Sequence, residues 1–157
     1  MNDRAIRRLA AAGVLCAVTF VLTAFMRIPL PAGYLNLGDF GVFFAALTLP
    51  TGYAVCVAGL GSMLADLYSF PVYAPATLLI KGLAALLCSL LWRRLPQKIR
   101  YLALLSALLI PVGYGIFEWF FFRAYAAADF LPNLLQATVG AGLAIAVRKL
   151  TKDRFTV

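Results

Sequence analysis

The sequence contains no histidine and only three cysteines in its 157 residues. Imidazole is a ligand in most zinc and haem sites, so its absence argues against a metal centre of those kinds. Cys16, Cys56 and Cys88 each stand alone in an apolar run, and an odd count at such spacing argues against a disulfide framework. We interpret the cysteines as small apolar residues and expect no metal or other cofactor.

Charge is also scarce, and acidic charge most of all. Only 13% of residues are charged and 64% are hydrophobic, with a mean hydropathy of +0.92. Soluble domains are usually about 45–50% apolar, so these values indicate an integral membrane protein. There are 14 Lys and Arg against 6 Asp and Glu, which gives a net charge of +8. A nucleic-acid-binding domain would need a soluble basic face, whereas basic residues beside membrane spans are expected on the cytoplasmic side.

The apolar runs predict an all-α fold, a single bundle of six transmembrane helices over residues 1–157. The first span follows a basic N-terminus, Met1 to Arg8, that resembles a signal sequence but has no clear cleavage site after it, so we expect it to be retained. Residues 28–39 are expected to form a loop, because two prolines and two glycines interrupt them. The predicted spans are residues 9–27, 40–50, 53–67, 77–92, 101–122 and 132–147.

The distribution of basic residues decides between one span and two in the region 40–67. Two spans place the basic clusters at 4–8, 93–100 and 148–154 on the same side of the membrane. Eleven of the 14 basic residues then lie on the cytoplasmic side, as the positive-inside rule requires, and both termini are predicted to be cytoplasmic. The proline-containing turn at residues 50–52 agrees with this division.

The stretch from Gly59 to Gly82 carries an acid and a base, Asp66 and Lys81, within apolar sequence. Pro71 and Pro75 predict a turn between them, so both charges are expected near the outer face of the membrane. Ionisable groups inside a membrane are costly and mark functional sites. The two groups are expected either to neutralise each other as a structural pair or to contact a ligand.

Other polar groups are predicted to reach the same depth from other spans. Asp39 is expected either to cap the second span or to join the site. Trp119 is the aromatic residue of the fifth span best suited to stack on a flat ligand, and the phenylalanines around it are expected to face lipid. The cytoplasmic halves of the spans carry few such groups, so the pattern indicates a wet cup open to the outside and not a channel. The candidate substrate-binding residues are Tyr34, Asn36, Asp39, Asp66, Tyr73, Lys81, Glu118, Trp119, Asn133 and Gln136.

Small residues recur along the first span. Ala12 and Cys16, and Gly13 and Ala17, stand four positions apart and form adjacent faces of a helix. Such faces allow a second helix to approach closely. These four residues are therefore candidates for contact with a partner protein, with chance occurrence in an alanine-rich span as the alternative.

Several motifs in sequence order resemble those of one family. They are Tyr34-Leu-Asn-Leu-Gly-Asp39, Gly61-Ser-Met-Leu-Ala-Asp66, Tyr73-Ala-Pro-Ala-Thr77 with Lys81-Gly82, Gly113-Tyr114 with Glu118, and Pro132-Asn133-Leu-Leu-Gln136. Together they resemble the substrate-binding (S) components of energy-coupling factor (ECF) vitamin transporters. Within these, the branch for hydroxymethylpyrimidine and pyridoxine uptake is the most similar.

The resemblance implies a non-enzymatic subunit of an ABC-type importer in the bacterial cell membrane. It also implies a transmembrane coupling subunit and two ABC-type ATPases as partners, with the helix face of Gly13 and Ala17 at the contact. The chain has no G-x-x-x-x-G-K-[ST] loop, so ATP would be hydrolysed by those partners.

Two other classes of protein remain as alternatives from the sequence. An intramembrane aspartyl peptidase would use Asp39 and Asp66 as two carboxylates that share a proton, although a neighbouring Lys81 would keep Asp66 ionised. A membrane protein of purely structural role would bind no ligand.

Overall fold

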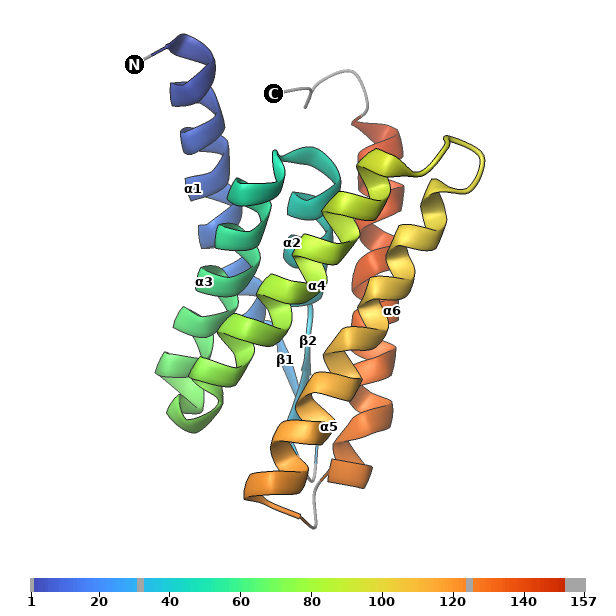
Figure 1. Ribbon diagram of the computed structural model, residues 1–157. Helices are drawn as coiled ribbons and strands as arrows, with labels where there is room; N and C mark the ends of the chain where they lie inside the picture. Colours follow the sequence, from blue (N-terminus) through green and yellow to red (C-terminus); the bar gives the residue numbers. More distant parts are fainter. Residues whose placement is uncertain (1, 31–32, 124–125, 152–157) are drawn as a thin grey trace.

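A computed structural model describes residues 2–30, 33–123 and 126–151 of the chain. It is a bundle of helices with one small β-hairpin (Figure 1). The helices are α1 (Asp3–Ala24), α2 (Gly38–Thr48), α3 (Thr51–Ser69), α4 (Ala74–Arg94), α5 (Leu109–Phe121) and α6 (Ala126–Leu150). Two 3₁₀ segments, η1 (Pro71–Tyr73) and η2 (Arg100–Leu108), precede α4 and α5.

Within the described residues, four segments are long and apolar enough to cross a membrane: Asp3–Ala24, Pro71–Arg94, Arg100–Phe121 and Ala127–Leu150. The apolar helix α2 is shorter, and it is followed by α3 after a break at Leu49 and Pro50. The described residues therefore form the expected helical membrane bundle, with six α-helices, while the prediction that six helices cross the membrane stays a prediction. Successive helices run in opposite directions, so the first turns of α1 and the last turns of α6 lie at the same end of the bundle (Figure 1). We call this the terminal end, and the opposite end the hairpin end.

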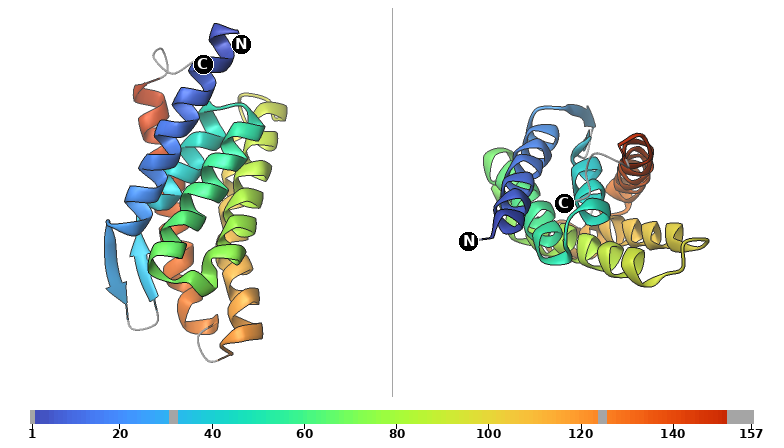
Figure 2. Two further views of the ribbon diagram at one scale, coloured as in Figure 1. Left: turned by 90° about the vertical axis from the view of Figure 1, so that its left-hand side faces the viewer. Right: turned by 90° about the horizontal axis from the view of Figure 1, so that it is seen from above.

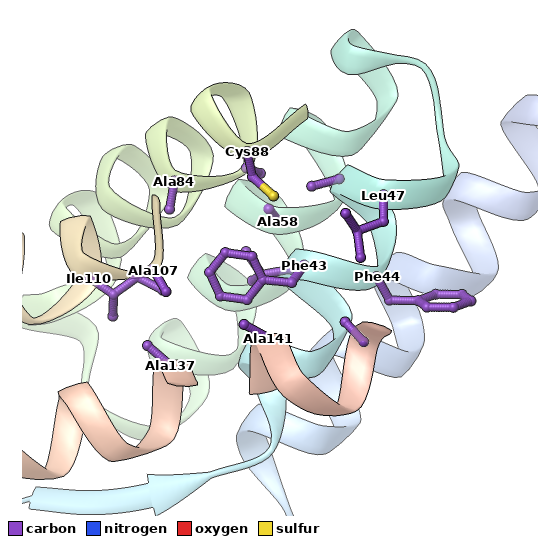
Figure 3. Close-up of a cluster of buried hydrophobic side chains, with 14 of the residues drawn as sticks. Phe43, Phe44, Leu47, Ala58, Ala84, Cys88, Ala107, Ile110, Ala137 and Ala141 are labelled. Carbon is purple, nitrogen blue, oxygen red and sulfur yellow. The ribbon is translucent and has the colours of Figure 1, made fainter. Parts of the chain in front are cut away.

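Helix α2 is the centre of the bundle. Nine of its eleven residues are buried, and it packs against α1, α3, α4 and α6. A helix that is apolar all round is buried on every side. The side chain of Phe43 lies between α4 and α6, among small residues such as Ala84 and Ala141, which leave room for its ring (Figure 3).

The hairpin corrects the prediction of a loop over residues 28–39. Strands β1 (Arg27–Leu30) and β2 (Gly33–Asn36) pair in antiparallel register, with Arg27 opposite Asn36. Proline is tolerated on an edge strand because its missing N–H can point away from the ladder, so Pro29 does not prevent pairing. The hairpin lies beside the bundle at the hairpin end (Figure 2).

Two other local expectations are wrong. Pro132 was expected in the first turn of the last span, but α6 begins at Ala126, so the proline lies inside the helix. The fifth span begins as the 3₁₀ segment η2 and not as an α-helix. Pro111 has no N–H to donate to the carbonyl of Ala107, which disfavours continuous α-helical bonding there. The cysteines are all free, but Cys56 is exposed on the bundle and only Cys88 is fully buried.

A close approach of α6 to the start of α2 fixes the relative position of these helices. A Cβ added to Gly140 would lie 2.7 Å from the backbone of Asp39 and Phe40, too close for any side chain. Only glycine therefore allows α6 to pass this near to Asp39.

We expect Gly140→Ala to destabilise the protein by about 1–3 kcal/mol, because backbone atoms must move to make room for the methyl group. Gly142→Ala is the matched control, since a Cβ there meets nothing within 4 Å. Thermal unfolding of both variants in one detergent measures the difference. Equal midpoints for the two variants would contradict this packing.

Candidate substrate site

The site begins with Asp39, in the first turn of α2. Its Oδ1 forms an ion pair with Lys81 Nζ from α4, and its Oδ2 accepts a hydrogen bond from Gln136 Nε2 of α6 at 3.1 Å. The three residues are 1%, 4% and 7% exposed. A buried charge is tolerated only when it is paired and hydrogen-bonded, and this arrangement satisfies both groups.

The same network holds the end of the hairpin. Gln136 Oε1 accepts a hydrogen bond from the backbone N–H of Asn36 at 2.8 Å. Asn36 Oδ1 in turn accepts from the N–H of Gly38 at 2.8 Å. The amide of Gln136 therefore joins the end of β2 to the carboxylate at the start of α2.

These contacts correct two interpretations of the sequence. The carboxylate in ion-pair contact with Lys81 is that of Asp39, whereas the sequence suggested Asp66. Asp39 does not cap α2 either, because the N-cap position is Leu37 and Asp39 lies inside the first turn. With Asp39 held by Lys81 and Gln136, the geometry does not favour the proton-sharing carboxylates of an aspartyl peptidase.

Asp66 belongs to a second chain of hydrogen bonds. Its Oδ2 accepts from the hydroxyl of Thr77, and Thr77 Oγ1 lies 2.7 Å from the hydroxyl oxygen of Tyr114. A threonine hydroxyl has one proton, so if Thr77 donates to Asp66, Tyr114 must donate to Thr77. Lys81 Nζ lies 5.4 Å from the centre of the Tyr114 ring, which links this chain to the first network.

A third group of polar side chains lies around Glu118, near the end of α5. Tyr73 of η1 donates a hydrogen bond to Glu118 Oε1 at 3.4 Å. Asp129 of α6 is close enough to interact electrostatically with both Glu118 and Tyr73. Glu118 is 2% exposed, and its Oε2 has no hydrogen-bond partner among the residues that the structure describes. Glu118 therefore has a hydrogen-bond donor in Tyr73 and a second carboxylate, Asp129, beside it.

Aromatic rings pack against the ring of Tyr73. Its ring stacks on Phe122 with centroids 5.7 Å apart and contacts Phe117 at 5.3 Å. Trp119, in contrast, is 64% exposed on the outer surface, like Phe120 and Phe121. The structure therefore does not bring Trp119 to the polar groups, and its expected stacking role has no support in the geometry.

The remaining predicted residues lie at the same end of the bundle. Asn133 is partly buried in α6, one turn before Gln136. Tyr34 lies in β2 with its backbone opposite Pro29, and its side chain falls outside the described part of the structure.

Three residues of these networks were not among the predicted site residues: Thr77, Tyr114 and Asp129. A signal for each was present, because each stands four positions before a residue that was chosen, namely Lys81, Glu118 and Asn133. Residues four apart share one face of a helix. The expectation of a wet cup is also wrong for Asp39, Glu118 and Gln136, whose side chains are buried.

The small residues of α1 divide between two surfaces. Ala12 is buried against α2 and α3, and Cys16 packs beside it, so both serve the bundle itself. Gly13 and Ala17 are exposed, and a Cβ on Gly13 would meet nothing within 4 Å. Helix α1 lies at the edge of the bundle (Figure 2). The candidate partner surface is thereby reduced to Gly13 and Ala17.

A helical membrane bundle that gathers buried acids, an amide and tyrosines at one end defines a membrane protein with a site for a small polar ligand. Comparison with known proteins agrees with this class. A family model described as "ECF-type riboflavin transporter, S component" matches residues 3–152. The chain belongs to this family of ECF transporter S components, so it is a substrate-binding subunit and not an enzyme.

Two individual matches also extend over most of this chain. An uncharacterised protein of Pyrococcus woesei is 31% identical over 142 residues, which cover 85% of this chain and 95% of the relative. A solved structure described as the S component of a bacterial ECF transporter matches with a TM-score of 0.77. It is 21% identical, and the match covers 93% of this chain and 96% of that one. That likeness establishes the fold, and the family implies a coupling subunit and ATPase subunits as partners.

The Asp39 and Lys81 pair gives a stability prediction. Asp39→Asn leaves the Lys81 ammonium buried without its carboxylate, and removal of one partner of a buried pair costs about 3–5 kcal/mol. Adding Lys81→Met to this variant removes the unpaired charge, so we expect the double variant to be more stable than Asp39→Asn alone. Thermal unfolding of the native protein, both single variants and the double variant measures this. A double variant with the summed loss of both single changes would show that the pair is not coupled.

Proposed function

We propose that the chain captures a small water-soluble vitamin or vitamin precursor from outside the cell and passes it to an ATP-driven importer. A single heteroaromatic ring with polar substituents, as in hydroxymethylpyrimidine or pyridoxine, fits the chemistry of the site best. The observation that carries this proposal is Glu118, a buried carboxylate with one oxygen unpartnered in the described residues.

The ligand class follows from hydrogen-bond chemistry. Carboxylates only accept hydrogen bonds, and Glu118 and Asp129 supply two of them beside the Tyr73 ring. A ligand with amino or hydroxyl groups, or a protonated ring nitrogen, supplies the donors that such a site lacks. Asn133 can both donate and accept, so it suits the other edge of a polar ring. Asp39, Lys81, Gln136 and Asn36 support the site by holding its helices and hairpin together.

Riboflavin is the second candidate ligand, because the description of the family names it. Calorimetric titration of the purified protein with hydroxymethylpyrimidine, pyridoxine and riboflavin separates the two. We expect hydroxymethylpyrimidine or pyridoxine to bind with a Kd at or below about 1 μM, which corresponds to a binding free energy of roughly −8 kcal/mol. Binding of riboflavin alone would assign the protein to flavin uptake, and binding of none of the three would remove this ligand class.

Glu118→Gln and Asn133→Ala should each weaken binding by at least about tenfold, because a lost hydrogen bond in a dry site costs about 1–3 kcal/mol. Trp119→Leu is the matched control on the same helix, and we expect it to bind normally because Trp119 is exposed. The measurement is titration with the vitamin that the native protein binds. Normal affinity in both site variants would place the ligand elsewhere.

The orientation in the membrane follows from charge. Basic residues gather at the terminal end of the bundle, so the proposal places that end in the cytoplasm and the polar site at the outer side of the cell membrane. A cysteine at Gln97, in a variant without the native cysteines, should not react with an impermeant reagent applied to intact cells. A cysteine at the exposed Val72 should react. The reverse pattern would contradict this orientation.

Coupling to the importer is proposed to use the exposed face of α1. The partners are a transmembrane coupling subunit and two ABC-type ATPases, and ATP is hydrolysed by those subunits. Gly13 and Ala17 leave space for a partner helix to approach closely. The exposed surface of α1 around them is strongly apolar, as at Leu9 and Val14.

Gly13→Leu or Ala17→Leu should abolish uptake but leave vitamin binding by the isolated protein unchanged, because the added bulk points away from the bundle. The same change at Gly52, exposed at the start of α3 with nothing within 4 Å of a Cβ there, is the control and should leave uptake intact. Uptake of radiolabelled vitamin by cells and vitamin binding in calorimetric titration are measured for the same variants. Normal uptake by both α1 variants would remove this face as the contact.

A further inference from the structure

Cationic side chains pack on two aromatic rings at the terminal end of the bundle, far from the polar site. Trp92, near the end of α4, is 8% exposed. The guanidinium carbons of Arg100 and Arg148 lie 5.3 Å and 5.1 Å from its ring centre. Lys149 Nζ lies 5.4 Å from the ring of Tyr101, which itself meets Trp92 edge-on at 5.7 Å. The α4–η2 connection and the end of α6 thus hold three cations in one place.

The cluster carries positive charge without a matching acid in the described residues. Arg148 is close enough to Arg100 and Arg93 to interact electrostatically with both. Arg100, Arg148 and Lys149 form no ion pair within the part of the chain that the structure describes. Arg100 Nε is buried and has no hydrogen-bond partner there. Repelling cations held this close are stabilised by an anion that binds between them.

An apolar groove runs between η2 and α6, and it shares Tyr101 with this cluster. It has a volume of about 490 Å³, and Lys98 and Tyr101 line it at the basic end. Leu102, Leu105 and Gly142 line it further along, with other apolar residues of η2 and α6. The groove is open beside Gly142 of α6, because no atom lies within 4 Å of the position that a Cβ would take there. Both walls belong to segments that are apolar enough to cross a membrane, so a bilayer around the bundle would place hydrocarbon beside the groove.

We propose that this groove binds one anionic phospholipid, with an acyl chain along η2 and α6 and the phosphate on Arg100 and Arg148. Guanidinium groups form charge-assisted hydrogen bonds to phosphate oxygens, and the Trp92 ring holds them in position. Basic pockets between membrane helices on the cytoplasmic side suit the head groups of anionic lipids. Basic residues near span ends are common, but here Tyr101 both lines the apolar groove and contacts Lys149 and Trp92 of the cationic cluster.

The test uses the full-length protein, purified in detergent and stripped of lipid. Phosphatidylglycerol is added, with phosphatidylcholine as the zwitterionic comparison, and bound lipid is counted by native mass spectrometry beside thermal unfolding. We expect phosphatidylglycerol to bind and raise the unfolding midpoint, while phosphatidylcholine does neither. Equal effects of the two lipids would overturn the proposal, because the phosphate cluster would then play no part.

Two kinds of variant locate the site. Arg100→Gln with Arg148→Gln should weaken phosphatidylglycerol binding by at least about tenfold, as expected for loss of charge-assisted hydrogen bonds. Arg94→Gln, which removes an exposed charge from the same end of α4, should not. Gly142→Leu fills the groove and should weaken lipid binding without changing vitamin binding.

Three results would contradict the site. Equal weakening by Arg94→Gln would indicate diffuse attraction, and normal lipid binding by Gly142→Leu would place the chain outside the groove. A double arginine variant that binds lipid normally but fails to assemble with the coupling subunit would make the cluster a protein contact instead.

Discussion

The ion pair between Asp39 and Lys81 is the interaction on which the arrangement of the hairpin end depends. It joins α2 to α4, and Gln136 extends it to α6 and to the end of β2. Charges this deep in an apolar bundle have no water to solvate them, so each must find its partner for the chain to fold. The requirement fixes which turn of α2 faces α4 and which turn of α6 faces both. Gly140 supports the same arrangement of helices, because only glycine at this position allows α6 to lie so near to Asp39.

The two ends of the bundle differ in chemistry, and the difference suits an importer subunit. The hairpin end holds carboxylates, an amide and tyrosines that come from α2, α3, η1, α5 and α6. The terminal end holds arginines and lysines around Trp92 and Tyr101. The apolar surface of α1, with Gly13 and Ala17 exposed on it, connects the two ends along one side. Ligand binding, membrane anchoring and contact with a partner can therefore occupy separate surfaces of a small protein.

The sequence predicts the order of the helices well because hydrophobicity along the chain reports membrane helices directly. It also predicts that Glu118 and Gln136 lie near one depth, since depth follows from position within a span. The sequence does not predict which charged side chains pair with each other. Lys81 was assigned to Asp66, fifteen residues away, whereas the ion pair is with Asp39, because the contact depends on how α2 packs between α4 and α6. The hairpin was missed because its prolines and glycines also indicate a loop, and Trp119 was misplaced because composition does not distinguish a lipid-facing ring from a buried one.

We propose that the hairpin end of the bundle binds the ligand while the ion pair and the terminal end remain as they are. Hydrogen–deuterium exchange of the purified protein, with and without the vitamin that binds in titration, is the sharpest test of this proposal. We expect added protection in the hairpin, η1, the last turns of α5 and the first turns of α6, with little change in α1. Protection concentrated in η2 and the last turns of α6, or spread along α1, would contradict it.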